Sequence, residues 1–253
     1  MSFLKSLYYT GLDILTLRKG VPRKINNHVV RFPARWSRYY ESNYEEENYN
    51  FLQQQVKKGM HIIDIGAHIG LFSVTASQLT GTEGKVICFE PTPGTFNTLT
   101  ETLRLNKCSN VTPVQAAVSE QSGVTTFYIS DIEACNSNSL VKNKEEKEIS
   151  AHEVKLVSID DVVATYSMRP SVIKIDVEGA ELDVLKGGIQ TFKSIKPILI
   201  LGMHPEFIKM KGDTLEAIWD LLIGCSYIVQ QEGKTLTKEF FCEQALLFDV
   251  HCI

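Results

Sequence analysis

The chain lacks the sequence signatures of several protein classes. Its six cysteines lie far apart, with no C-x-x-C pair and no cysteine–histidine cluster at the spacing of a zinc site. No apolar run reaches the ~20 residues that a membrane span requires, and the first 20 residues contain no continuous signal-peptide core or cleavage site. These absences predict free thiols, a cytoplasmic protein and no stable membrane insertion.

Clustered positive charge is also missing. The chain has 26 lysines and arginines against 30 aspartates and glutamates, for a formal net charge of −4. No block of basic residues forms a stripe that would follow a phosphate backbone. We therefore expect no nucleic-acid partner, and a small molecule or glycan is the favoured substrate class.

The 253 residues and 43% hydrophobic content suit one large α/β domain with an appendage. We divide the chain into an N-terminal appendage, residues 1–50, and a domain over residues 51–253 with an insertion around 123–150. The appendage has a predicted amphipathic helix within residues 1–20, followed by a basic and aromatic stretch over residues 31–40. Such a segment either covers a binding site, where aromatic rings suit a sugar, or packs against the sheet or a second subunit.

Apolar strands alternate with helical patterns from residue 61 onward, which predicts a doubly wound, mostly parallel sheet. We expect the last two strands to close the sheet, with one antiparallel strand in the edge region. A mobile loop is expected over residues 134–150, and either Ser158 or Asp160 caps a short helix. The expected strands begin near residue 61 and cover 85–89, 110–118, 123–130, 153–159, 172–176, 197–203, 227–231 and 244–251. The expected helices cover 49–58, 71–80, 95–106, 180–187 and 214–223.

The most informative stretch is the turn after the first of these core strands. Asp64, Gly66 and Gly70 form the pattern D-x-G-x-x-x-G, and glycine lets backbone approach a ligand closely. A dinucleotide fingerprint would need glycines where His68 and Leu71 stand, which disfavours a nicotinamide cofactor. The helix that follows could hold a carboxylate at its N-terminus. An ordinary tight turn is the alternative.

Acidic residues also end two further strands. Glu90 lies about twenty residues beyond the glycine turn, where an α/β nucleotide site places a carboxylate against ribose hydroxyls; a solvated turn is the alternative. Alternation directs Lys174, Asp176 and Glu178 to one side, where a ligand site or a buried Lys174–Asp176 salt link would explain them. His204 ends the next strand at the same rim. Two carboxylates fall short of an octahedral metal site, so we expect no metal.

Three stretches, IDIGAHIG (63–70), FEP (89–91) and KIDVEGAE (174–181), resemble the FkbM-type family of class I S-adenosylmethionine-dependent methyltransferases. The resemblance covers about residues 45–204. It implies a Rossmann-like sheet of seven strands with a reversed last strand, and O-methylation of a hydroxyl on a sugar, glycolipid or natural product. The chain departs from the family at His68, where asparagine is usual, and at Gly202, two residues before His204, where an acid is frequent.

The resemblance and the strand-end positions together nominate the site residues. The methyl acceptor's proton would pass to one of three residues, whose order stays open: Asp176, Glu178 and His204. The cofactor S-adenosylmethionine would contact Asp64, Gly66, Ala67, His68, Gly70, Glu90, Pro91, Ala116, Ala117 and Asp176. The alternatives are a nicotinamide-dependent oxidoreductase and a catalytically inactive cofactor-binding protein. If the appendage packs against a second subunit, we expect a homo-oligomer.

Overall fold

The structure is a computed structural model that describes residues 8–9, 11–12, 14–130 and 149–253. The described residues between 8 and 15 are helical, residues 16–19 are turn and bend, and the other positions of the expected N-terminal helix up to residue 15 lie outside the described residues. Most of the loop expected over 134–150, with Cys135, also lies outside them. The other five cysteines are free, as expected.

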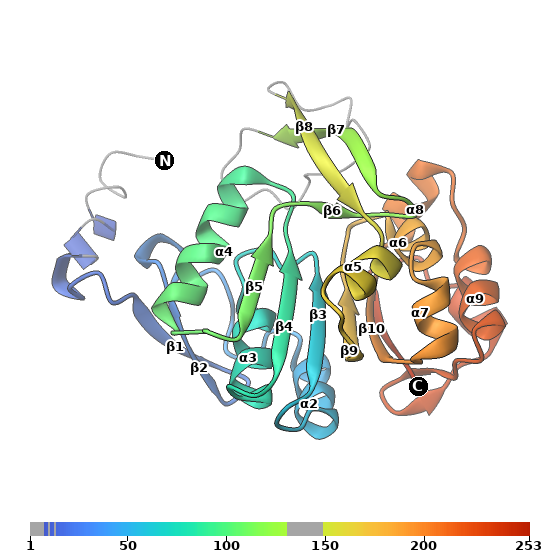
Figure 1. The fold of residues 1–253 in the computed structure, drawn as a ribbon, viewed down its shortest axis with the longest axis horizontal. Coiled ribbons are helices and arrows are strands. Elements are labelled where there is room, and N and C mark those ends of the chain that lie inside the picture. The colour runs from blue at the N-terminus through green and yellow to red at the C-terminus, as the bar shows by residue number, and fades with distance from the viewer. Residues whose placement is uncertain (1–7, 10, 13, 131–148) are drawn as a thin grey trace.

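An eight-stranded sheet forms the centre of the described structure (Figure 1). The strands β3, β4, β5, β9 and β10 are parallel, and β13 pairs antiparallel with both β10 and β11. In spatial order the strands are β12 (Lys234–Thr235), β11 (Val229–Gln231), β13 (Phe248–Cys252), β10 (Ile198–Met203), β9 (Pro170–Ile175), β3 (His61–Ile65), β4 (Lys85–Phe89) and β5 (Val111–Val114).

The predicted α/β class with a mostly parallel sheet is confirmed, and two details differ. The main sheet of the described structure has eight strands instead of the expected seven, because the two-residue strand β12 also pairs with β11. The reversed strand β13 lies between β10 and β11, so it is an interior strand of the sheet rather than its edge. This position leaves the carboxyl end of β10 beside the amino end of β13, so a residue early in β13 can reach the same rim as the ends of the parallel strands.

Alternating side chains give each sheet face its own core. One face buries Ile63, Phe89 and Ile173, and the other buries Ile62 and Val172. The helices packed on the first face are α5 (Ile159–Thr165), α6 (Glu181–Lys186), α7 (Ile189–Ser194), α8 (Pro205–Lys211), α9 (Leu215–Gly224) and α10 (Lys238–Cys242). Those on the second are α2 (Glu46–Gln55), α3 (Leu71–Thr80) and α4 (Pro93–Leu105). Helices α7, α8 and α10 were not predicted, and Ser158 is the cap of α5.

The strand predicted over 110–118 is two strands. After β5 the backbone N–H of Ala116 donates to the carbonyl of Val114, and this turn takes the chain out of the main sheet. The next residues form β6 (Ala117–Val118), which pairs with β8 (Ile149–Val157), itself paired with β7 (Gly123–Ser130). This small sheet stands above the carboxyl ends of the central strands (Figure 1).

The appendage contains a hairpin that the sequence analysis missed. Strands β1 (Val21–Ile25) and β2 (His28–Phe32) are joined by Asn26 and Asn27, which both have positive φ, 45° and 68°. Two left-handed residues match the twist of a tight hairpin, and asparagine tolerates that conformation. A short 3-10 helix, η1 (Ala34–Trp36), follows. The apolar side of the hairpin packs into the core on the α3 and α4 face.

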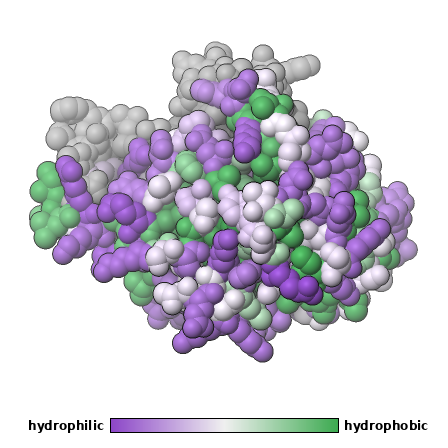
Figure 2. Space-filling model, in the orientation of Figure 1, coloured by the Kyte–Doolittle hydropathy of each residue, from purple (hydrophilic) through white to green (hydrophobic). Residues whose placement is uncertain are grey.

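Polar and apolar side chains are interspersed on the face seen in Figure 2. Within the described ranges, no helix has the length and apolar character needed to span a membrane.

Candidate active site

A cavity of about 300 Å³ lies where the parallel strands end. Its lining comes from the segments that follow β3, β4, β5, β9 and β10, from the start of β13, and from residues 39–49 of the appendage. The carboxyl ends of parallel strands are where open α/β sheets bind ligands, and this volume lies within the range of small-molecule sites.

Protein neighbours closely surround the glycine turn after β3. A Cβ on Gly66 would lie 1.9 Å from the carbonyl oxygen of Asp176, and one on Gly70 would lie 2.6 Å from Cδ1 of Leu99. Both glycines have positive φ, 81° and 92°. Close packing is thus sufficient to require both glycines. Gly66 lines the cavity and Gly70 does not, so ligand approach stays a prediction for Gly66 alone.

Asp64, the fourth residue of β3, is fully buried beneath this turn. Its Oδ2 accepts a 2.5 Å hydrogen bond from the Ser73 hydroxyl on α3, while its Oδ1 has no hydrogen-bond partner among the described residues. Burial raises the pKa of Asp64 to about 6, against the opposing charge of Lys174. A buried acceptor without a donor is costly, so this oxygen suits a ligand that brings a donor.

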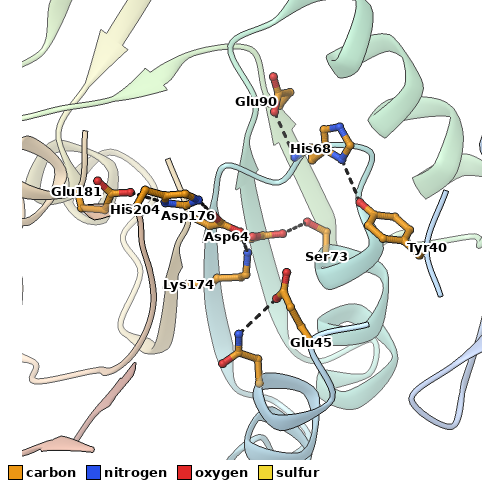
Figure 3. A network of polar contacts seen from close by, with 11 residues as sticks. Tyr40, Glu45, Asp64, His68, Ser73, Glu90, Lys174, Asp176, Glu181 and His204 are labelled. Atoms are coloured by element: carbon orange, nitrogen blue, oxygen red, sulfur yellow. Dashed lines mark hydrogen bonds and ion pairs between the residues drawn. The ribbon is translucent and has the colours of Figure 1, made fainter. Parts of the chain in front are cut away.

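Glu90, which follows β4, is fixed by two backbone donors. Its Oε1 accepts from the N–H of Thr92 at 2.9 Å, and its Oε2 accepts from the N–H of His68 at 3.2 Å (Figure 3). Burial raises the pKa of Glu90 to about 7, although both hydrogen bonds favour the ionised form. Each oxygen keeps a second lone pair for a hydroxyl donor.

His68 links this turn to the appendage. Its backbone is left-handed, with φ of 50°, and its Nδ1 is hydrogen-bonded to the Tyr40 hydroxyl at 3.0 Å. The rings of Trp36 and Tyr39 lie 6.0 and 5.2 Å from the imidazole. Burial lowers the pKa of His68 to about 4, so the ring is neutral at pH 7. Because the His68 backbone also holds Glu90, the appendage braces the carboxylate that faces the cavity.

The salt link weighed for β9 is present. Lys174 Nζ lies 2.7 Å from Oδ2 of Asp176, and Asp176 Oδ1 lies 3.6 Å from Nε2 of His204. Burial opposes ionisation of Asp176, yet Lys174 and His204 hold its pKa below the usual value. The lowered pKa and the ion pair with Lys174 make Asp176 a weak proton acceptor.

His204 is held by a residue that the sequence analysis did not nominate. The fully buried Glu181 accepts from His204 Nδ1 at 2.8 Å and from the backbone N–H of Gly179 at 3.0 Å. Although burial opposes its charge, Glu181 and Asp176 raise the pKa of His204. The one sequence signal was an acid in the first turn of the helix after the glycine.

Glu178 differs from its neighbours on this rim. It has a left-handed backbone, with φ of 50°, and no ion pair with any described residue. Burial raises the pKa of Glu178 to about 8, with His204 opposing and Asp176 adding to the shift. A carboxyl group with this pKa is suited to exchanging protons near neutral pH.

The structure brings together most of the nominated residues. Gly70 alone of them is outside the cavity, and the nominated residues in the lining are Asp64, Gly66, Ala67, His68, Glu90, Pro91, Ala116, Ala117, Asp176, Glu178 and His204. No group of three or more histidine, cysteine or acidic side chains in the described ranges is arranged to hold a metal ion.

Several lining residues were not nominated. One group comes from the appendage and another from the start of β13 and the residue before it, and together with two residues from elsewhere they include Tyr39, Tyr40, Tyr44, Glu45, Tyr49, Thr92, Lys211, Leu247 and Asp249. The aromatic content of residues 36–49 was a signal for the first group. The second group had no sequence signal, because only the sheet topology brings β13 to this rim.

Comparison with known proteins gives a consistent assignment. A family model described as the methyltransferase FkbM domain matches residues 64–229, more than half of the chain. Hexuronic acid methyltransferase AglP of Haloferax volcanii is 28% identical over 199 residues, covering 74% of this chain and 78% of the relative. Methyltransferase sdnD of Sordaria araneosa is 29% identical over 185 residues, covering 61% and 70%.

Among solved structures, methyltransferase FkbM from Methylobacillus flagellatus KT aligns with a TM-score of 0.51 at 16% identity, over 82% of this chain and 51% of that chain. This chain thus spans about half the length of that one, and at this identity the likeness shows the fold alone. It confirms the predicted Rossmann-like methyltransferase fold, and the family match favours methyl transfer over nicotinamide chemistry. The chain belongs to the FkbM family of methyltransferases.

Proposed function

We propose that this methyltransferase uses S-adenosylmethionine to methylate a hydroxyl group of a sugar, glycolipid or natural product. The observation that carries the proposal is Glu90, which two backbone N–H groups fix at the tip of β4 facing the cavity. A carboxylate there suits the two ribose hydroxyls of a nucleoside.

The rest of the lining fits the cofactor's other groups. Asp64 offers an unpartnered buried oxygen for the ammonium group, and the N-terminal turn of α3, with Leu71 and Phe72 on the cavity, suits the carboxylate. Ala116 and Ala117 leave a flat apolar edge for adenine. When bound, S-adenosylmethionine supplies an activated methyl group on a sulfonium, and the many carboxylates of the lining favour that positive charge.

Among the three candidate proton acceptors, Glu178 fits the role best. Asp176 is tied to Lys174, and His204 lies between Asp176 and Glu181, whose charges raise its pKa and so favour its protonated form. Glu178 lines the cavity, lacks an ion pair within the described structure and has a pKa of about 8. In its ionised form, whose share rises as the pH approaches 8, it would accept the hydroxyl proton as the oxygen attacks the methyl carbon, which is worth about 10²–10⁴-fold in rate.

A sugar acceptor is supported by the tyrosines that face these groups. Tyr39, Tyr40, Tyr44 and Tyr49 line the cavity from the appendage, and aromatic faces suit the flat apolar face of a sugar ring. The relative AglP is named for a hexuronic acid, which is consistent with a sugar ring as acceptor but not with the preference for an uncharged sugar proposed below. We further propose that residues 1–50 act as an appendage that walls the site of the domain over residues 51–253.

Two measurements test the proposal. Calorimetry should show one-to-one binding of S-adenosylhomocysteine and none of NAD⁺ by the full chain. Radiolabelled methyl donor offered with glycan and natural-product extracts should then label a product that base treatment does not hydrolyse, as an ether requires. Binding without any labelled product would support the inactive cofactor-binding alternative, and NAD⁺ binding would support the oxidoreductase.

A further inference from the structure

The floor of the cavity is open between two carboxylates. Gly202 is the fifth residue of β10, and a Cβ built on it would lie 3.1 Å from Oδ1 of Asp176 and 3.5 Å from Oδ1 of Asp249. Gly202 and Asp249 are directly paired in the antiparallel register of β10 and β13, so their side-chain positions lie on the same face of the sheet. Asp249 therefore reaches over the space that a side chain at position 202 would fill.

Asp249 is held on this floor by its neighbours. It is half-buried and lines the cavity. A hydrogen bond from the buried Asn48 favours its ionised form, and Asn48 also donates to Glu45 at 3.3 Å and is bonded to His251 at 3.0 Å. This network joins α2 of the appendage side to β13 and fixes the carboxylate before any ligand arrives.

The cations of the lining are already paired. Lys174 is bound to Asp176 at 2.7 Å and His204 to Glu181 at 2.8 Å. The ammonium of Lys211 is held by Asp183 at 2.8 Å and by Asp213 at 2.6 Å.

The acids are in excess. Among the described residues, five acids of the cavity lining have no ion-pair partner: Glu45, Asp64, Glu90, Glu178 and Asp249. Burial, with added repulsion from Glu45 and Asp176, raises the pKa of Asp249 to about 6. A further anion placed here would meet the same unfavourable desolvation and repulsion without gaining a cation.

We propose that Asp249 is a specificity-determining residue of an acceptor subsite over Gly202, which binds an uncharged polyhydroxy ring and rejects the corresponding sugar acid. The subsite rests on the proposed methyl transfer, since the acceptor must lie beside the proton acceptor Glu178. Asp249 and Asp176 accept hydrogen bonds from neighbouring ring hydroxyls. The absent side chain at Gly202 leaves room for the ring edge, and the exposed Tyr44 borders the cavity mouth.

The test uses matched sugar pairs on the full chain loaded with S-adenosylhomocysteine. The probes are the methyl glycosides of glucose, galactose and mannose, each paired with its uronic acid, so that the members of a pair differ only at carbon 6. Calorimetry or saturation-transfer NMR measures their binding. We expect at least one neutral glycoside to bind, with its uronic acid at least about tenfold weaker.

Two variants locate the effect. Asp249→Asn should weaken binding of the neutral glycoside about tenfold, because a charge-assisted hydrogen bond is lost. It should also reduce the difference in affinity between the neutral and acidic sugars. Gly202→Ala places a methyl group on the floor and should also weaken the glycoside, which keeps the subsite testable if Asp249→Asn does not fold. Asp220→Asn, on the exposed side of α9 where it pairs with Lys238, should match the wild type.

The outcomes separate this inference from the proposed function. Failure of the wild type to bind S-adenosylhomocysteine contradicts the proposed function itself. Three results obtained with normal cofactor binding would overturn the subsite alone. The uronic acids bind more tightly than the neutral glycosides, or no probe binds, or neither variant changes the affinity for the glycosides. Normal cofactor affinity and melting temperature in the variants are required before their sugar affinities are compared.

Discussion

The two walls of the cavity are built in different ways. One wall consists of the strand ends after β3, β4 and β9, where backbone geometry sets each functional group: Gly66 packs against a carbonyl, and Glu90 is held by backbone N–H groups. The opposite wall, from residues 39–49 and the start of β13, is made of side chains such as Tyr44 and Asp249. The first wall tolerates little substitution, whereas the second can change with the acceptor.

The comparison predicts its largest effect at Gly66. Gly66→Ala should lower the free energy of unfolding by about 3–5 kcal/mol and prevent binding of S-adenosylhomocysteine, because a Cβ would lie 1.9 Å from a carbonyl oxygen at a φ of 81°. Gly70→Ala is the matched control and should cost about 1–2 kcal/mol, since it meets the mobile end of Leu99. Urea unfolding measures both. Equal costs for the two variants would contradict the account.

Glu178 tests the chemistry at the border of the two walls. Glu178→Gln should lower methyl turnover about 10²–10³-fold while cofactor affinity stays within twofold, because the amide cannot accept the proton. Initial rates with the labelled acceptor and calorimetry measure the two quantities. His204→Gln at the same rim should lower turnover less, and a larger loss there than at Glu178 would assign the proton to His204 instead.

Glu90 should give the cofactor site its pH dependence. Since its pKa is about 7 in the free protein and ribose hydroxyls favour the carboxylate, binding releases a proton below pH 7. Affinity for S-adenosylhomocysteine should rise about tenfold from pH 6 to pH 8 and then level off. Glu90→Gln should weaken binding about tenfold at pH 8 and remove most of this rise. Glu101→Gln, on the exposed side of α4, is the control, and a slope retained in Glu90→Gln would assign the titration elsewhere.

The smallest effect on cofactor affinity should come from the hydrogen bond between Tyr40 and His68, which connects the two walls. Tyr40→Phe removes the 3.0 Å hydrogen bond to His68 and should weaken cofactor binding about two- to fivefold through the Glu90 contact. The ring of Tyr44 packs on Tyr40 at 4.6 Å, and its hydroxyl is not hydrogen-bonded to His68 within the described structure, so Tyr44→Phe should leave the calorimetric affinity for S-adenosylhomocysteine unchanged. The same affinity in both variants would mean that the appendage does not act on the cofactor wall.

The residues of the first wall, formed by the strand ends, could be predicted from the sequence because the signals for them are local. An apolar strand, an acid and a turn glycine lie within a few residues of one another, and parallel strands must end at one rim. The pattern thus nominated Asp64, Glu90 and Asp176, which all line the cavity. The physical role of Gly66 was beyond the sequence, because its neighbour Asp176 lies more than a hundred residues away.

The other wall depends on contacts that no local pattern encodes. Asp249 reaches the rim only because β13 inserts between β10 and β11, and Tyr40 reaches His68 only because the β1–β2 hairpin packs on α3 and α4. The hairpin itself had a signal in the consecutive Asn26 and Asn27, which we did not use. Tertiary packing, rather than residue type, decides the members of this wall.

The most direct test of the central claim is a crystal structure of the full chain with S-adenosylhomocysteine. We expect the nucleoside in the strand-end cavity, with its ribose hydroxyls within hydrogen-bond distance of Glu90 and its sulfur facing the space between Glu178 and Asp249. A nucleoside bound elsewhere, or a Glu90 carboxylate turned away from the ribose, would contradict the account.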